Sequence, residues 1–259
     1  MIKTKKQRAI DAYNKGLKAK YAGDWLESLT QNQLADKLHP GDEATIWNLG
    51  IAATALHEWD EARRAWRAYG IETNDGPGEV LTSPVTGCVR IDPDNRGEVV
   101  WGTRIDPARI RLLNVPLPES GRRYGDILLN DGAPEGTRKS GKSEYPVFNE
   151  LGIWKTSPYS TYEVDLIEFG SEAIQSLKQK CDHANIGFED WGTIRILCAA
   201  CSRGEPGEHT CSSESIAGHR FAFAATSEAS LRKLINEWRE TEPDGKLGEI
   251  KLVVPGVSA

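Results

Sequence analysis

No hydrophobic run in this 259-residue sequence approaches the roughly 20 consecutive apolar residues that a membrane-spanning helix needs. The N-terminal segment, residues 1–16, is basic but lacks the apolar core of a secretory signal peptide. Cysteine is scarce, and its five copies, an odd number, do not fit a disulfide framework, which agrees with a reducing compartment. We therefore expect a cytoplasmic protein without a membrane partner.

Recognisable catalytic motifs are also lacking. The five histidines form no serine–histidine–aspartate or cysteine–histidine order that is typical of hydrolases, and neither GxSxG nor HExxH occurs. The sequence therefore offers no nucleophile, and we expect a protein that is not an enzyme. With 39% hydrophobic and 27% charged residues, the chain has the composition of an ordinary globular protein that can bury a sizeable core.

The net charge of −6 is unevenly distributed along the chain. Residues 1–75 and residues 76–157 each sum to zero, so the whole excess of negative charge falls in residues 158–259. An acidic chain of this kind is not expected to bind nucleic acid. An acidic face can instead speed the encounter with a basic protein, and the alternative is a solvated acidic surface. The candidate partner-binding residues are Glu163, Asp165, Glu189 and Asp190.

An internal repeat runs through residues 1–75. At one constant offset, the identical pairs are Gly16 and Gly50, Ala19 and Ala53, and Trp25 and Trp59. This period and the second copy, residues 44–70, resemble the tetratricopeptide repeat, a helix–turn–helix unit. The first copy departs from that family, with Lys15 in place of leucine and Asn32 in place of an aromatic residue. The resemblance implies a concave surface that binds protein segments, and two repeats need further packing to be stable.

The rest of the chain predicts two further units. Short β-rich runs separated by turn signals, such as the one at residues 130–134, predict an antiparallel β unit over residues 76–157. The remainder of the chain predicts strand 161–169, helix 171–184, strands 193–199 and 219–225, helix 227–240 and strand 249–254. This β-α-β-β-α-β order is that of a ferredoxin-like fold. The predicted fold class is therefore α+β, with tetratricopeptide-like, β-rich and ferredoxin-like domains at residues 1–75, 76–157 and 158–259.

Residues 136–143, with the sequence GTRKSGKS, match the phosphate-binding loop pattern literally. That pattern needs a helix directly after it, and Pro146 with its strand-forming neighbours opposes one. A solvated basic loop is therefore the preferred interpretation, with nucleotide binding as the alternative. Five arginines between residues 104 and 123 are likewise expected on a solvated sheet face, with anion binding as the alternative.

A cluster of cysteine and histidine residues gives a candidate metal site. The spacing C-x2-C-x7-H-x-C is formed by Cys198, Cys201, His209 and Cys211. Such a set can close a tetrahedral zinc site around an irregular loop. Against zinc, Cys198 continues a strand pattern with Ile194 and Ile196, as a core cysteine would. Two interpretations stay open, a structural zinc ion and free thiols, and no other cofactor is expected.

Residues 98–136, 145–151 and 195–204 resemble, in overall texture, bacterial repeat proteins similar to the immunity proteins that accompany contact-dependent polymorphic toxins of the Rhs class. The resemblance implies a cytosolic inhibitor that binds a cognate toxin domain and blocks its active site. The missing catalytic motifs, the repeat and the acidic C-terminal region agree with this function. Two alternatives stay open: a tetratricopeptide adaptor or chaperone with no toxin partner, and an enzyme whose site carries no recognisable motif.

Overall fold

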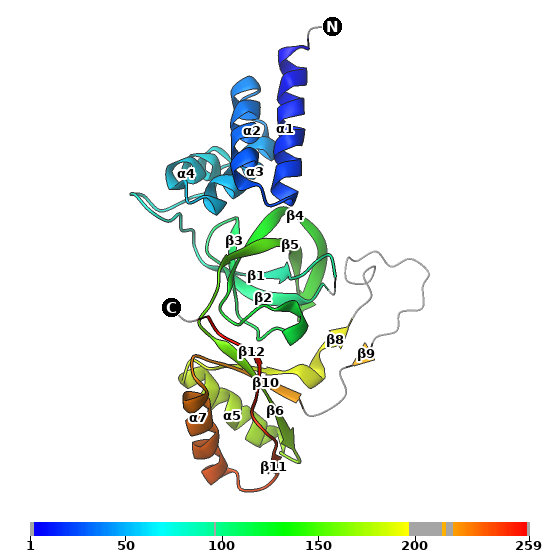
Figure 1. The fold of residues 1–259 in the computed structure, drawn as a ribbon, viewed down its shortest axis with the longest axis vertical. Coiled ribbons are helices and arrows are strands. Elements are labelled where there is room, and N and C mark those ends of the chain that lie inside the picture. Colours follow the sequence, from blue (N-terminus) through cyan, green and yellow to red (C-terminus); the bar gives the residue numbers. More distant parts are fainter. Residues whose placement is uncertain (1–2, 96, 197–213, 216–219, 258–259) are drawn as a thin grey trace.

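The computed structural model describes residues 3–95, 97–196, 214–215 and 220–257. It has the mixed α and β structure that the sequence predicts. Three parts follow one another along the long axis: four helices, a β-barrel and a unit of helices packed on a sheet (Figure 1). No helix within the described ranges is long and apolar enough to cross a membrane.

The N-terminal part consists of two helical hairpins, formed by α1 (Lys5–Tyr21), α2 (Trp25–Leu38), α3 (Glu43–Ala55) and α4 (Trp59–Ala68). The side chains of Thr4, Asp24 and Asp42 cap the first three helices, since each accepts a hydrogen bond from a main-chain N–H of the first turn. The helix boundaries therefore follow from local chemistry that is present in the sequence.

The same glycine contact holds each hairpin together. A Cβ added at Gly50 would lie 2.6 Å from the ring of Trp66, and one added at Gly16 would lie 2.7 Å from the side-chain amide of Asn32. Gly16 and Gly50 are one repeat period apart, and so are Asn32 and Trp66. Asn32 therefore occupies in the first hairpin the position that Trp66 fills in the second, and the sequence period corresponds to a repeated helix–helix contact.

Residues 85–155 form a closed barrel of five strands, β1 (Val85–Arg90), β2 (Val99–Arg104), β3 (Arg109–Leu112), β4 (Ile127–Ser140) and β5 (Ser143–Lys155). Neighbouring strands are antiparallel except at the closure, where β1 and β5 run parallel. A short 3-10 helix, η1 (Pro118–Ser120), lies between β3 and β4. The interior is filled by the buried side chains of Val89, Ile91, Val100, Ile110, Leu112 and Leu128.

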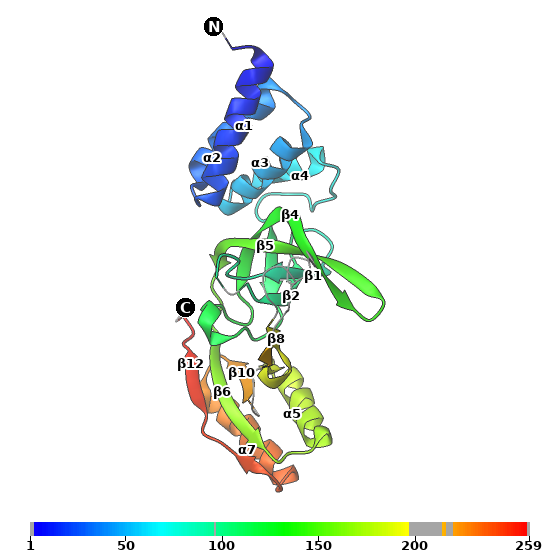
Figure 2. The same cartoon turned by 90° about the vertical axis from the view of Figure 1, so that its right-hand side faces the viewer.

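Strands β4 and β5 form a long hairpin that extends beyond the barrel wall (Figure 2). The predicted turn at residues 130–134 is wrong, because this segment lies inside β4. Its glycine and proline are accommodated by shifts of register between Asn130 and Pro134 and between Pro134 and Thr137. Such bulges insert extra residues in one strand, so turn-forming residues can occur without a chain reversal.

The phosphate-loop pattern lies at the tip of this hairpin. Ser140 pairs with Ser143 across the turn, and β5 begins at Ser143, where a phosphate-binding loop requires the start of a helix. The segment therefore lacks the row of helical N–H groups that bind phosphates in such loops.

Lys142→Ala is accordingly expected to leave nucleotide affinity and stability unchanged. Isothermal titration with magnesium ATP should show no saturable micromolar binding by either protein. The free energy of unfolding should change by less than about 0.5 kcal/mol, since the side chain is exposed. Micromolar binding by the unmodified chain that disappears in the variant would contradict this assignment.

The C-terminal unit follows the order β6 (Ser160–Ile167), α5 (Ser171–His183), β7 (Gly187–Asp190), β10 (Arg220–Ala225), α7 (Glu228–Thr241) and β12 (Lys251–Val254). In the sheet these strands lie in the order β12-β6-β10-β7, every neighbouring pair antiparallel, and β11 (Lys246–Leu247) pairs with the end of β6. Both helices cover one face, where they bury Tyr162, Val164, Leu166, Leu177, Phe223 and Trp238.

Along the chain, the second strand of this sheet is β7, which differs from the strand 193–199 that the sequence predicts. The predicted strand 193–199 contributes only β8 (Arg195–Ile196), which pairs with β9 (Glu214–Ser215) in a separate small sheet. The position in the main sheet is taken by β7, which a 3-10 helix, η2 (Trp191–Thr193), separates from β8. Strand β7 has only four residues and no β-branched side chain, so it gives little sequence signal.

Candidate functional site

One face of the helical hairpins packs on the barrel and is not available to a partner. The ammonium group of Lys20 forms a buried ion pair with Asp131, with Nζ 2.7 Å from Oδ1. The indole Nε1 of Trp154 donates to the carbonyl oxygen of Thr54 over 3.3 Å. Lys20 and Thr54 are also one repeat period apart, so equivalent positions of α1 and α3 contact the barrel. A partner site must therefore be sought elsewhere.

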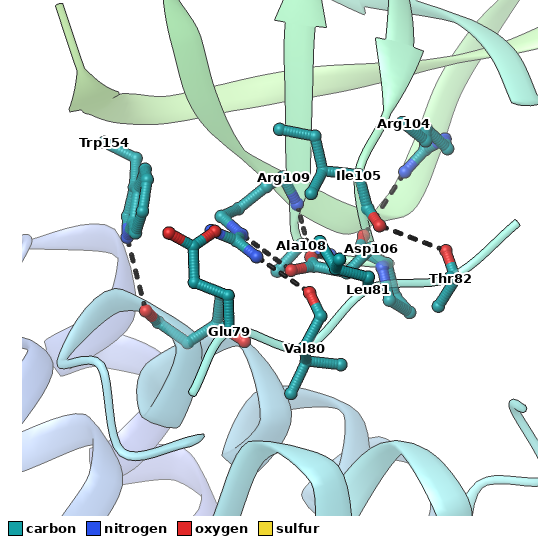
Figure 3. A network of polar contacts seen from close by, with 12 residues as sticks. Glu79, Val80, Leu81, Thr82, Arg104, Ile105, Asp106, Ala108, Arg109 and Trp154 are labelled. Atoms are coloured by element: carbon teal, nitrogen blue, oxygen red, sulfur yellow. Dashed lines mark hydrogen bonds and ion pairs between the residues drawn. The ribbon is translucent and has the colours of Figure 1, made fainter. Parts of the chain in front are cut away.

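A buried arginine lies at the same junction (Figure 3). Arg109 at the start of β3 is 0% exposed, and its Nε lies 2.6 Å from Oδ2 of Asp106. Its Nη1 lies 2.8 Å from Oε2 of Glu79, and its Nη2 donates to the carbonyl oxygen of Val80 over 2.8 Å. Three hydrogen-bonding directions of one guanidinium group are thus satisfied by the barrel and by the segment that joins it to the helices.

Two tryptophans enclose this guanidinium group. The Cζ of Arg109 lies 4.9 Å from the ring centroid of Trp59 on α4 and 4.4 Å from that of Trp154 on β5. Both distances are within the range of cation–π attraction. The expectation that Arg109 lies on a solvated sheet face is wrong, and the reason is that carboxylates and aromatic rings from distant segments surround it. The arginine joins parts of the structure and has no exposed group to offer a ligand.

A groove of about 840 Å³ lies where the barrel meets the C-terminal unit, and it is the candidate functional site. Its walls come from α5, from β7 and from barrel residues that include Asn114 and Tyr124. Its apolar lining is formed by Leu113, Ile174, Ile186, Phe188 and Phe221. Its charged lining is formed by Lys178, Asp182, Glu189 and Asp190. The lining is therefore mostly polar with some apolar side chains, and the volume lies in the range of about 300 to 1,000 Å³ that is common for binding sites.

Two of the four predicted partner-binding residues line this groove. An oxygen of Glu189, Oε2, accepts a hydrogen bond from Nδ2 of Asn114 over 2.7 Å. Burial raises the pKa of the Glu189 carboxyl above its ordinary value, and the bonds from Asn114 and from the main chain of Val115 oppose that shift. Asp190 is half-buried and accepts from the main-chain N–H of Gly192 over 2.9 Å, which caps η2. The groove therefore holds these two carboxylates in fixed positions.

The other two predicted residues lie on β6, which β10 separates from β7, and they do not line the groove. Glu163 accepts from both Nε and Nη2 of Arg220, the latter over 2.9 Å, and this pairing lowers the pKa of the carboxyl. Asp165 is half-buried and lies opposite Arg220 in the strand register. The structure thus brings together Glu189 and Asp190, and it places Glu163 and Asp165 at a different position on the sheet.

Sequence reasoning did not select Asp182 and Lys178, which complete the charged lining. They lie one helical turn apart on α5, and both side chains are exposed. A sequence signal for them exists, because each directly follows a buried residue, Leu177 or Cys181, on the helix that precedes β7. Only the packing of α5 beside β7 places their charges next to Glu189.

A further carboxylate lies behind the segment 113–117. Oε2 of Glu98 accepts a hydrogen bond from the main-chain N–H of Leu117 over 3.0 Å. Burial raises the pKa of Glu98 to about 7, and the charges of Glu189 and Glu119 act in the same direction. On the other side of this segment, Nε1 of Trp191 donates to the carbonyl oxygen of Val115 over 3.0 Å. The segment is therefore one polar connection between the barrel and the C-terminal unit.

The predicted zinc ligands Cys198, Cys201, His209 and Cys211 lie outside the described residues, so zinc binding stays a prediction. Among the residues that the structure describes, no group of three or more His, Cys, Asp and Glu side chains is arranged to hold a metal ion. Cys88 and Cys181 are buried free thiols, and burial raises their pKa to about 11 and about 12, respectively.

No protein family model matches the chain, and a search of curated proteins found no significant match. Among solved structures, a hypothetical protein from Neisseria gonorrhoeae is similar, with 11% sequence identity and a TM-score of 0.30. The alignment covers 68% of this chain and 98% of that one. A similarity at this TM-score assigns neither a fold family nor a function to this chain.

Proposed function

We propose that this chain is an immunity protein of the cytoplasm, which binds a cognate bacterial toxin domain and blocks its active site. The observation that carries the proposal is the groove between the barrel and the C-terminal unit. It is lined by three carboxylates and one ammonium group, together with several apolar side chains. Such a surface complements a basic protein, as many toxins that act on nucleic acids or nucleotides are expected to be.

We further propose that the helical hairpins are tetratricopeptide-like and that the C-terminal unit is ferredoxin-like. The repeated glycine contact of the two hairpins supports a tetratricopeptide-like N-terminal part. The sheet order β12-β6-β10-β7, with two helices on one face, supports a ferredoxin-like C-terminal part. The contacts of Lys20 and Thr54 with the barrel disfavour a peptide-binding adaptor that uses that face of the helices. The groove is therefore the preferred place for a partner.

The test is co-expression with the toxin domain encoded by the adjacent upstream reading frame. We expect restored growth and a 1:1 complex in size-exclusion chromatography, with an interface of about 1,200 Å² or more. Asp182→Lys is expected to slow association several-fold at low salt and less at high salt, because complementary charge acts mainly on the association rate. Stopped-flow measurement at two ionic strengths gives this rate.

Glu240→Lys is the matched control, since it makes the same charge change on an exposed position of α7. Its association rate should stay within about twofold of that of the unmodified protein. If co-expression gives no growth rescue and no co-purifying complex, the proposed function is contradicted. An association rate equally insensitive to salt and to both variants would show that the groove carboxylates form only a solvated surface.

A further inference from the structure

Strand β7 is an edge of its sheet. It is hydrogen-bonded to β10 on one side, and the sheet ends there. Among the residues that the structure describes, no main-chain bond joins the main chain of residues 187–189 to a segment on the other side, and the N–H of Val115 bonds the side-chain carboxyl of Glu189. An edge strand with free N–H and C=O groups is a template for pairing with another extended segment.

The groove follows this free edge. All four residues of β7 line it, with α5 on one side and Asn114 and Tyr124 of the barrel on the other. The groove therefore reaches this edge at the half-buried residues Phe188, Glu189 and Asp190, whereas Gly187 is buried, and it is bounded on both sides. A segment that enters the groove meets main-chain groups at its centre and side chains at its walls.

The chemistry of the two walls differs, because the side chains of a strand alternate between the faces of its sheet. Phe188 points toward the side of the helices, where it stacks with Phe221 at a centroid distance of 5.7 Å. Glu189 points toward the barrel, where it bonds Asn114. A strand added beside β7 would place every second side chain next to Phe188 and the others next to Glu189.

We propose that the groove binds an extended segment of the partner protein as an additional strand beside β7, and that arginine or lysine alternates with apolar residues in this segment. The basic side chains lie on the side of Glu189, and the apolar ones lie on the side of Phe188 and Ile174. Long basic side chains suit this groove because their aliphatic stems can cover its apolar lining. This mode of recognition is strand addition, in which main-chain bonds give affinity and alternate side chains give specificity. The identity of the partner rests on the proposed function, whereas the chemistry of the bound segment is inferred from the groove.

The test uses the full chain and a six-residue peptide of alternating arginine and valine with blocked ends. Binding is measured by titration calorimetry and by NMR shift changes. We expect saturable binding and shift changes at Gly187, Phe188 and Glu189. Two further peptides carry N-methyl groups, one on the arginines and one on the valines. Alternate N–H groups of a strand point to opposite edges, so one methylated peptide should lose at least tenfold in affinity and the other should keep most of it.

Asp182→Lys should weaken binding of the peptide about fivefold, and Glu240→Lys should change it less than twofold. A peptide with glutamate in place of arginine should not bind. Equal affinity of both methylated peptides, shift changes away from β7, or no saturable binding up to millimolar concentration would each overturn the strand-addition proposal.

This outcome is separable from that of the proposed function. If the arginine–valine peptide binds at β7 and the neighbouring toxin domain does not bind the chain, the groove inference stands and the immunity function fails. If the toxin domain binds and the peptide neither binds nor competes with it, the immunity function stands and the strand addition fails.

Discussion

Replacement of Arg109 by methionine is expected to lower the free energy of unfolding by about 3 to 5 kcal/mol, because it leaves the carboxylate of Asp106 buried without its cation. Both side chains are 0% exposed, so water cannot take the place of the guanidinium group. The variant also loses the stacking of Arg109 between Trp59 and Trp154. Urea unfolding followed by tryptophan fluorescence measures the difference.

Arg111→Met is the matched control, because Arg111 lies two residues further along β3 and is exposed. Its free energy of unfolding should stay within about 0.5 kcal/mol of that of the unmodified protein. Asp106→Asn in the Arg109→Met background should recover part of the loss, since it removes the unpaired buried charge. A loss below about 1 kcal/mol for Arg109→Met, or no recovery in the double variant, would contradict the role assigned to this ion pair.

Glu98→Gln is expected to stabilise the protein above neutral pH. The folded state holds the proton of Glu98 up to a pKa of about 7, whereas the ordinary value is 4.5. As pH rises from 4.5 to 7, the unfolded chain releases this proton first, so stability falls over that range. A pKa difference of this size corresponds to about 3 kcal/mol, and glutamine avoids the loss because it stays neutral and can still accept the bond from Leu117.

The measurement is the free energy of unfolding at pH 5, 6, 7 and 8 for the unmodified chain, for Glu98→Gln and for Glu240→Gln. Other buried acids, such as Asp106 and Asp126, have a raised pKa as well, so only the difference between proteins isolates Glu98. We expect Glu98→Gln to match the unmodified chain at pH 5 and to exceed it at pH 8, whereas the exposed Glu240→Gln matches it throughout. Parallel pH curves for all three proteins would refute this account.

Local signals predicted the elements whose boundaries local chemistry sets. Helix α5, expected at 171–184, occupies Ser171–His183, and α7, expected at 227–240, occupies Glu228–Thr241. The mixed class follows from such signals. Strand β7 was missed because Gly187 and its three successors form a short run with little β-branched character, and a more β-rich run lies directly after them.

The candidate site could not be assembled from the sequence, because its parts come together only through packing. Glu189 is bonded by Asn114, 75 residues earlier in the chain, and Asp182 reaches the groove through the position of α5. The environment of Arg109 is equally non-local, since Glu79, Trp59 and Trp154 lie in three other segments. The distribution of charge along the sequence indicates the acidic region and two of the groove carboxylates. It does not show that Glu163 is paired with Arg220, because that pairing depends on the strand register.

The contact between α3 and the barrel has a consequence for synthesis on the ribosome. Trp47 packs on Gly132, and Thr54 is bonded by Trp154, so the face of α3 that meets the barrel is covered only when β4 and β5 exist. Thr54 and Trp154 are 100 residues apart in the chain. At about 5–20 residues per second, translation of that stretch takes about 5–20 s. During this interval the nascent hairpins present an uncovered apolar face to solvent, and the speed of elongation through the barrel sets how long that exposure lasts.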